Sequence, residues 1–142
     1  MLDANVLISY LLTADQQSPV VEIVEAVARG ELMLLFPAEL LDELARRVPS
    51  KPYLAGRIAT EDLMQLTSLL SELSEPIPTL TEPIPPLTRD PKDDYLIAYA
   101  VVCEADYLVT GDADLLALHQ IGDLRIVSPR EFVALQGGST AR

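Results

Sequence analysis

The segment DPKDDYLIAYAVVCEADYLVTGD, residues 90–112, holds the pattern that decides the fold. Asp90 is a favoured helix N-cap and Pro91 fits the first helical position, so we expect a helix over 90–104. The short apolar run at 107–110 that follows predicts a buried strand. A helix that leads directly into a buried strand is the repeating unit of an α/β fold.

The same alternation of helices and apolar strands extends along the chain in both directions. Further helices are expected from Ser18 to Gly30 and over 38–48, 60–73, 113–119 and 128–136, and further strands over 31–36 and 124–128. The strand runs are apolar throughout, which is typical of strands covered on both faces. The sequence therefore predicts an α/β fold, a three-layer α/β/α sandwich around a mostly parallel central sheet.

Length and composition restrict the classes of function. With 142 residues the chain fits one domain, which we expect over 1–136, followed by a disordered tail at 137–142. Its single cysteine, Cys103, excludes an intramolecular disulfide and favours the cytoplasm. No apolar stretch reaches the roughly 20 residues of a membrane span. The net charge of −12 opposes general attraction to nucleic acid, so any such binding must be local.

Two tandem heptads interrupt the pattern. EPIPTLT at 75–81 and EPIPPLT at 82–88 agree at six of seven positions. Because each proline lacks a ladder donor, we expect an extended surface connection here with at most one short edge strand.

Acidic residues fall where the strands of such a sheet would end. Asp3 follows the first apolar residues and Asp112 follows the strand at 107–110. Asp93 and Asp94 lie in the first turn of the helix before that strand, and Glu43 borders the buried face of the helix at 38–48. Ligands bind at the carboxyl edge of parallel sheets, and carboxylates held close together raise one another's pKa unless a cation lies between them. Hard divalent ions with oxygen ligands, Mg²⁺ or Mn²⁺, are the expected cofactors. The residues leave open whether one ion binds or two.

Four segments then match a known family in order along the chain: LDANVLIS at 2–9, PAELLDEL at 37–44, DPKDDYLIAYA at 90–100 and ADYLVTGDADLL at 105–116. In these segments the sequence resembles PIN-domain proteins, which are small α/β/α folds with Mg²⁺- or Mn²⁺-dependent ribonuclease activity. The resemblance is greatest to members that are toxins of toxin–antitoxin pairs. It implies an endoribonuclease with an RNA substrate, an antitoxin partner and a homodimeric assembly.

The resemblance also assigns site residues. The catalytic and metal-binding acids fall on Asp3, Glu43, Asp93 and Asp112. Glu39 is an alternative register for the glutamate, and Asp94 is an alternative for the third aspartate. Supporting polar positions fall on Asn5, Asp94, Thr110 and Asp114. Relatives carry several residues before the first aspartate, whereas here only Met1 and Leu2 do, so the first strand is expected to be short by about two or three ladder positions.

Four of the ten basic residues follow Glu43 closely: Arg46, Arg47, Lys51 and Arg57. They form a candidate RNA-binding surface that would guide phosphates to the acids, although a solvated helix face explains them equally well. Two other functions compete with the nuclease. One is a catalytically inactive PIN-fold binding module, and the other is an aspartyl phosphatase, which Asn5 disfavours because it stands where a second aspartate is needed.

Overall fold

The structure is a computed structural model that describes residues 1–13, 15–75, 77, 80, 84, 86, 88 and 90–140, with the side chains of Glu75, Lys92 and residues 137–140 left out. In chain order the elements are α1 (Ala4–Leu12), α2 (Pro19–Ala28), β1 (Leu34–Leu35), α3 (Ala38–Ser50), α4 (Pro52–Ala55), α5 (Thr60–Leu73), β2 (Ser74–Glu75), α6 (Pro91–Val102), β3 (Tyr107–Val109), α7 (Ala113–Leu116), β4 (Gln120–Ile121), β5 (Leu124–Val127) and α8 (Pro129–Thr140). Most of the two proline heptads lies outside the described residues.

Short strands form two small sheets. β1 pairs with β2 in parallel, and β5 lies between β3 and β4, parallel to the first and antiparallel to the second. The β4–β5 hairpin turns through Gly122, whose φ of 57° is a backbone conformation that glycine adopts without steric cost. A single parallel bridge joins Leu2 to Val109 of β3.

The predicted α/β class is confirmed, but the described residues form a small three-stranded mixed sheet and a separate parallel pair, so one mostly parallel central sheet is not clearly present. The three-stranded sheet is mixed because residues 120–121 form an edge strand of a hairpin, whereas the sequence pattern indicated a helix continuing to 119. The run at 31–36 contributes only two residues of strand. The observed fold is therefore rich in helices around short strands.

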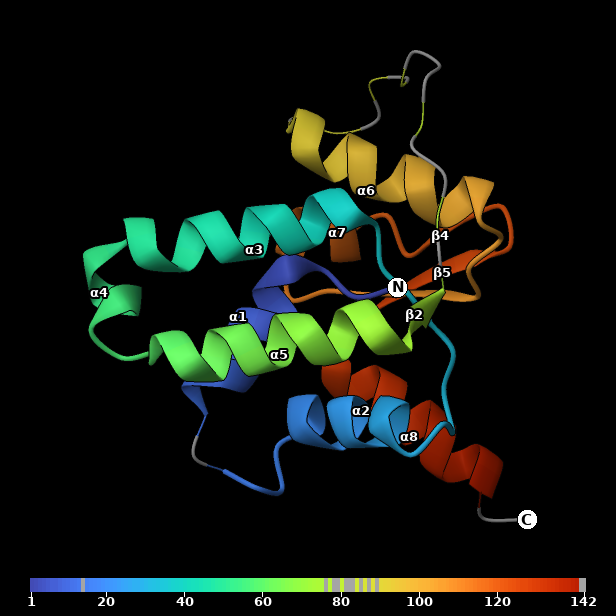
Figure 1. Cartoon of the computed structure of the whole chain (residues 1–142). Helices are drawn as coiled ribbons and strands as arrows, with labels where there is room; N and C mark the ends of the chain where they lie inside the picture. The colour runs from blue at the N-terminus through green and yellow to red at the C-terminus, as the bar shows by residue number, and fades with distance from the viewer. Residues whose placement is uncertain are drawn as a thin grey trace.

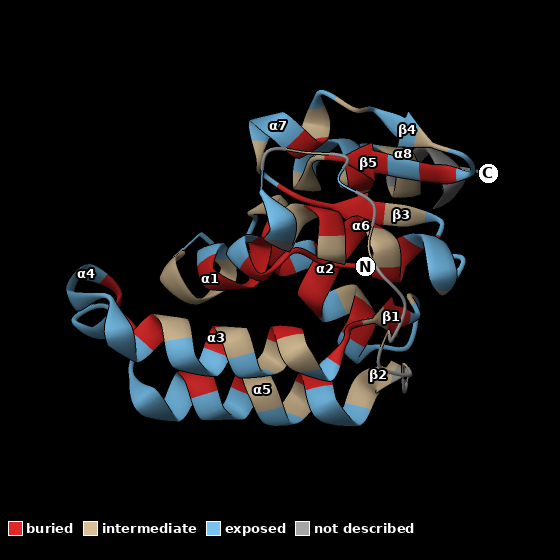
Figure 2. Ribbon diagram, turned by 90° about the horizontal axis from the view of Figure 1, so that it is seen from above, coloured by how far each residue is buried: buried red, intermediate tan, exposed pale blue. Residues whose placement is uncertain are grey.

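Helices lie on both sides of the strands. Figure 1 shows α6 on one side of β5 and the pair α2 and α8, which pack against each other, on the other side. α3 and α5 pack along each other and extend away from the strands to α4, as Figure 2 shows. The buried apolar cluster runs from Met1 to Phe132 and draws on helices and strands alike. This core supports the sheet edge at which the acidic residues lie.

Helix boundaries follow local sequence signals closely. α5 spans the predicted residues 60–73, and the predicted capping box at α8 is present, with the Ser128 amide donating to Glu131 Oε1 and the Glu131 amide donating to Ser128 Oγ, both at 3.1 Å. α3 continues two residues beyond its expected end at 48, through Pro49, although proline has no amide to donate to the helical ladder. α8 includes 137–140, residues that the sequence analysis assigned to the tail, while 141–142 lie outside the described residues.

Candidate active site

Asp3 is positioned by the pairing of the first residues with β3. The Val109 amide donates to the Met1 carbonyl at 2.9 Å, and the Asp3 amide donates to the Val109 carbonyl at 3.0 Å. Asp3 therefore lies beside Thr110, whose hydroxyl donates to Asp3 Oδ2 at 2.8 Å. Both residues are buried. Two residues ahead of Asp3 are thus enough to hold it at the end of β3.

Thr110 also positions the next acid. Its Oγ1 accepts a hydrogen bond from the Asp112 amide at 3.0 Å, so one hydroxyl contacts both Asp3 and Asp112. Asp112 is the N-cap of α7, and its Oδ1 accepts from the Asp114 amide at 2.8 Å. Asp3 has the same arrangement at α1, where its Oδ1 accepts from the Asn5 amide at 3.3 Å. Each carboxylate is therefore oriented by backbone donors of the helix that it caps.

Asp93, in the first turn of α6, lies near these acids. Burial raises the pKa of Asp93 to about 6, and surrounding negative charges add to the shift. In decreasing order those charges belong to Asp112, Asp90, Asp3 and Asp114. Since charge interactions weaken with distance, the structure brings together carboxylates from three separate segments of the chain. The charges of Asp3 and Asp112 thus act on Asp93, while the predicted role of these acids as metal ligands stays a prediction.

The neighbouring Asp94 has a different environment. It is buried, and its Oδ1 accepts a hydrogen bond from the Thr88 amide at 2.6 Å. Successive helical residues point about 100° apart, so only one of the two aspartates can face the cluster. The geometry therefore favours Asp93 as the metal-binding acid and gives Asp94 a role in fixing the turn that precedes α6.

The α3 residues reach the site less directly. Arg47 Nη1 donates to Asn5 Oδ1 at 3.0 Å and lies 3.9 Å from Glu43 Oε1, so Arg47 connects Glu43 to the helix that Asp3 caps. Glu43 is not among the charges that raise the pKa of Asp93. Glu39, the alternative register, accepts a hydrogen bond from the Tyr99 hydroxyl at 3.0 Å. Of the two glutamates, Glu43 is the one linked to the Asp3 side of the site.

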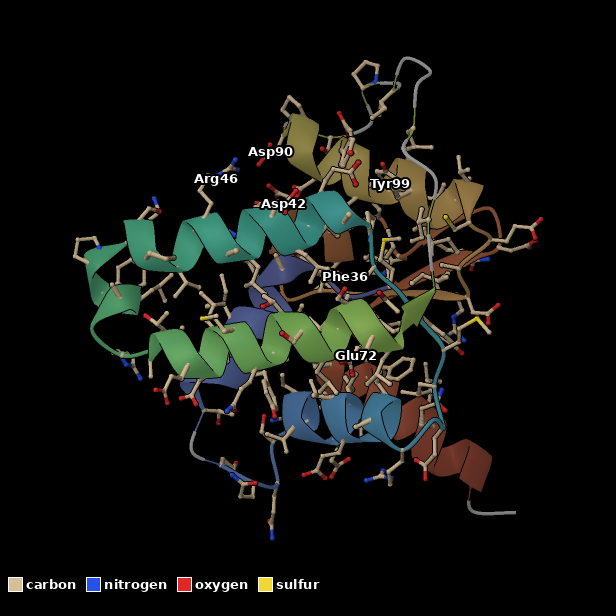
Figure 3. The ribbon with its side chains drawn as sticks, viewed as in Figure 1. Phe36, Asp42, Arg46, Glu72, Asp90 and Tyr99 are labelled. Carbon is tan, nitrogen blue, oxygen red and sulfur yellow. The ribbon has the colours of Figure 1, made fainter. Side chains whose placement is uncertain are left out.

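The four candidate RNA-binding residues differ in their surroundings. Arg46, Lys51 and Arg57 are exposed on α3 and around α4, whereas Arg47 is held between Asn5 and Glu43. Figure 3 shows Arg46 and Asp42 on α3 and Asp90 at the start of α6, grouped on one face of the molecule. Arg46 is therefore the basic residue best placed to meet a phosphate near the acids.

The donor set suits a hard divalent cation. Asp3, Asp93 and Asp112 offer only carboxylate oxygens, and a carboxylate that accepts one hydrogen bond keeps further lone pairs. Among the described residues no three acidic, histidine or cysteine side chains already form a ligand set for a metal ion. The acids thus lie near one another without a completed coordination sphere, and the uncompensated charge around Asp93 is what a cation would neutralise.

Comparison of the sequence with known protein families identifies the family of this chain. A family model described as PIN domain matches residues 1–114. The chain belongs to the PIN-domain family. PIN domains are generally nucleases and typically use divalent metal ions, and the match contains all four predicted acids. No curated protein matches the chain. The part of the PIN domain that the structure describes has no helix long and apolar enough to cross a membrane.

Sequence reasoning overlooked two contributions to the site. Asp90 was interpreted only as a helix cap, yet its charge is the second largest of those that shift the pKa of Asp93. The signal was its position three residues ahead of Asp93, within one helical turn. The hydrogen bond between Glu39 and Tyr99 was also missed, because it joins residues 60 positions apart that no local pattern relates.

Proposed function

We propose that this PIN domain is a Mg²⁺- or Mn²⁺-dependent endoribonuclease. The observation that carries the proposal is the hydrogen-bonded group of Asp3, Thr110 and Asp112 next to Asp93, whose pKa is raised first by burial and then by the charges of Asp112, Asp90 and Asp3. Such clustering of like charges opposes folding and is typical of sites that hold a cation. Asp3, Asp93 and Asp112 would hold the ion, and Glu43 would complete the set directly or through water.

The residues of the chain supply positioning and charge. A bound divalent ion supplies Lewis-acid polarisation of the phosphodiester and lowers the pKa of the attacking water. The Thr110 hydroxyl hydrogen-bonds to the Asp3 carboxylate and to the Asp112 amide, which positions both residues. Arg47 contacts both Asn5 and Glu43 and holds them next to these acids. Arg46 would attract the RNA backbone to this edge. Above about pH 6 most Asp93 side chains are charged and able to bind the ion.

Cleavage of single-stranded RNA with Mg²⁺ or Mn²⁺ tests this proposal, with Asp93→Asn compared against Asp94→Asn. We expect Asp93→Asn to abolish cleavage while Asp94→Asn, if it folds, retains it. Equal cleavage by the wild type and by both variants would refute the assignment of Asp93 and Asp94 alike. Titrating Mn²⁺ while monitoring thermal unfolding adds a readout independent of activity, because an ion bound only by the native state raises the midpoint.

The alternative function is a PIN-fold binding module without catalysis. A folded chain with no Mn²⁺-dependent rise of the unfolding midpoint and no cleavage would favour it. One observation supports this second function: among the described residues, no three acidic, histidine or cysteine side chains form a group that could hold a metal ion.

We further propose that the chain is the toxin of a toxin–antitoxin pair acting in the cytoplasm. Its support is the resemblance of the four acidic segments to such toxins. Expression of the wild type should arrest growth, and expression of Asp93→Asn should not. A short gene next to this one that encodes a DNA-binding protein able to relieve the arrest would identify the antitoxin.

A homodimer is proposed on the same basis. Tyr53 on α4 and Met64 on α5 are 66% and 62% exposed. α4 lies away from the strands (Figure 2), and large exposed apolar side chains there would suit a protein interface. Light scattering should give the mass of a dimer for the wild type and of a monomer for Met64→Lys.

A further inference from the structure

A groove next to the acidic cluster shares Glu43 and Arg46 with the proposed active site and adds residues that the proposed function does not use. It lies between α3 and the first turns of α6 and has a volume of about 470 Å³, within the range of small-molecule sites. Its lining includes Glu39, Asp42, Glu43, Arg46, Pro91 and Tyr95. Pro91 begins the helix that carries Asp93 two residues later, so the groove opens beside the candidate site for phosphodiester cleavage.

The net charge of the lining disfavours a phosphate inside the groove, although Arg46 can still attract a phosphate that lies beside it. Three carboxylates and one guanidinium line it, so the local charge is negative. Ionised carboxylates only accept hydrogen bonds, so the ligand must present donors and carry little negative charge. The bases of single-stranded RNA meet both conditions, because proteins recognise them by stacking on aromatic rings and by hydrogen bonds to their Watson–Crick edges.

Glu39 is held in place from the buried side. The Tyr99 hydroxyl is fully buried, accepts hydrogen bonds from the Tyr95 hydroxyl and from the Leu80 amide, both at 3.1 Å, and donates its own proton to Glu39 Oε1 at 3.0 Å. Since both acceptor positions of the hydroxyl are filled, its proton is committed to Glu39. The carboxylate is therefore a fixed acceptor that retains lone pairs for a ligand.

Tyr95 supplies the aromatic wall. Its ring makes an edge-to-face contact with the ring of Tyr99, with centroids 4.8 Å apart and an interplanar angle of 75°. The Tyr95 hydroxyl donates its proton to the Tyr99 hydroxyl at 3.1 Å, so the ring is held by this hydrogen bond as well as by the aromatic contact. A ring that is held by an aromatic contact and by a hydrogen bond of its hydroxyl offers a rigid surface for a flat ligand.

We propose that this groove binds one unstacked guanine of the RNA, with Glu39 accepting hydrogen bonds from its Watson–Crick edge and Tyr95 forming its aromatic wall. Guanine has two adjacent donors there, the N1–H and the 2-amino group, which match the two oxygens of one carboxylate. Uracil offers a single donor between two carbonyl acceptors, which the carboxylates would repel. The inference rests on the proposed nuclease activity and adds a base preference to it.

Binding of mononucleotides tests the groove without any cleavage. Calorimetry with Mg²⁺ should show guanosine 5′-monophosphate binding the wild type at least about ten-fold more tightly than uridine 5′-monophosphate, as expected for a matched pair of hydrogen bonds. Glu39→Gln keeps an acceptor for Tyr99 but presents an amide donor to the base, so it should remove this preference. Glu61→Gln, at an exposed position in the first turn of α5, is the matched control and should retain it.

Two further variants separate recognition from folding. Tyr95→Phe keeps the ring and should retain binding, while Tyr95→Ala should weaken the binding of both nucleotides by about ten-fold, because stacking contributes for every base. Equal affinity of the wild type for the two nucleotides would overturn the proposal, as would a Glu39→Gln protein with the wild-type preference. Thermal unfolding of each variant shows whether it is folded.

Cleavage of short single-stranded RNAs that differ only in one guanine or uracil distinguishes this inference from the proposed function. A preference in kcat/KM for the guanine substrate that Glu39→Gln removes supports both. Cleavage of the two substrates at equal rates, unchanged in Glu39→Gln, overturns the base preference and leaves the nuclease intact. Guanine-selective binding without any cleavage supports the groove and refutes the nuclease.

Discussion

Asp93→Asn should stabilise the metal-free protein, although it should abolish activity. The pKa of Asp93 rises from 3.8 to about 6 on folding, which at full weight corresponds to a penalty of about 3 kcal/mol for its charged form. Asp93 is only partly buried, so solvent screens much of the repulsion. We therefore expect a gain of about 1 kcal/mol in the free energy of unfolding, or roughly 2–6 °C in Tm for a chain of this size.

The gain should depend on pH in a defined direction. A carboxyl whose pKa is raised in the folded state binds its proton more tightly there, so folding carries no penalty below about pH 4, where both states are protonated. The penalty grows as the pH rises towards 6 and is complete above it. Asp93→Asn should thus match the wild type near pH 4 and exceed it most at about pH 8.

Thermal unfolding in EDTA at several pH values measures this difference. Asp123→Asn is the matched control, because Asp123 is exposed in the β4–β5 hairpin and does not contribute to the shift at Asp93. A second scan with Mn²⁺ should reverse the order of stability, since the wild type gains from the bound ion and Asp93→Asn gains little. An Asp93→Asn protein that is less stable than the wild type at pH 8 without metal would refute the argument of charge convergence.

Three other substitutions test how the site and fold are held. Thr110→Val removes the hydroxyl shared by Asp3 and Asp112 and should cost about 1–3 kcal/mol in urea unfolding as well as weaken the Mn²⁺-dependent rise in Tm, whereas Thr110→Ser should restore both. Ser128→Ala removes the N-cap of α8 and should cost about 1 kcal/mol in the same assay, with no change in the Mn²⁺ response. Leu108→Ala empties a fully buried position in β3 and should cost about 2–5 kcal/mol, with faster amide exchange throughout the strand.

Local signals in the sequence were sufficient where the structure depends on neighbouring residues. The ends of α5 and the start of α6 follow from N-terminal acids, the Asp90–Pro91 pair and apolar periodicity. α1 was not predicted, because the apolar run at 6–8 that follows Asp3 fits a helix and a strand equally well at that length. β4 was missed for a related reason, since a hairpin strand of two residues is too short to show alternation.

The candidate site was likewise predictable from the sequence only in part. The strand-edge rule led to Asp3, Asp93 and Asp112 as one site, and the charges of Asp3 and Asp112 act on Asp93, while their role as metal ligands stays a prediction. Periodicity could not choose between Asp93 and Asp94, since both occupy the first turn of α6 and only the rotation of that helix decides which faces the cluster. That rotation is set by distant partners such as Thr88 and the core beneath α6.

Because the net charge of the chain is −12, a bound cation would affect the binding of RNA as well as its cleavage. A protein that binds RNA through a basic surface loses affinity as Mg²⁺ rises, because the ion competes for phosphate. Here the acids around Asp93 and the carboxylates of the α3–α6 groove repel phosphate until an ion neutralises the cluster. Binding of RNA should therefore increase with Mg²⁺ before it falls. In the proposed nuclease the ion would link an acidic protein to an acidic polymer. Backbone pairing of Leu2 with Val109 holds the strand ends, so the core would tolerate the repulsion of the cluster without metal.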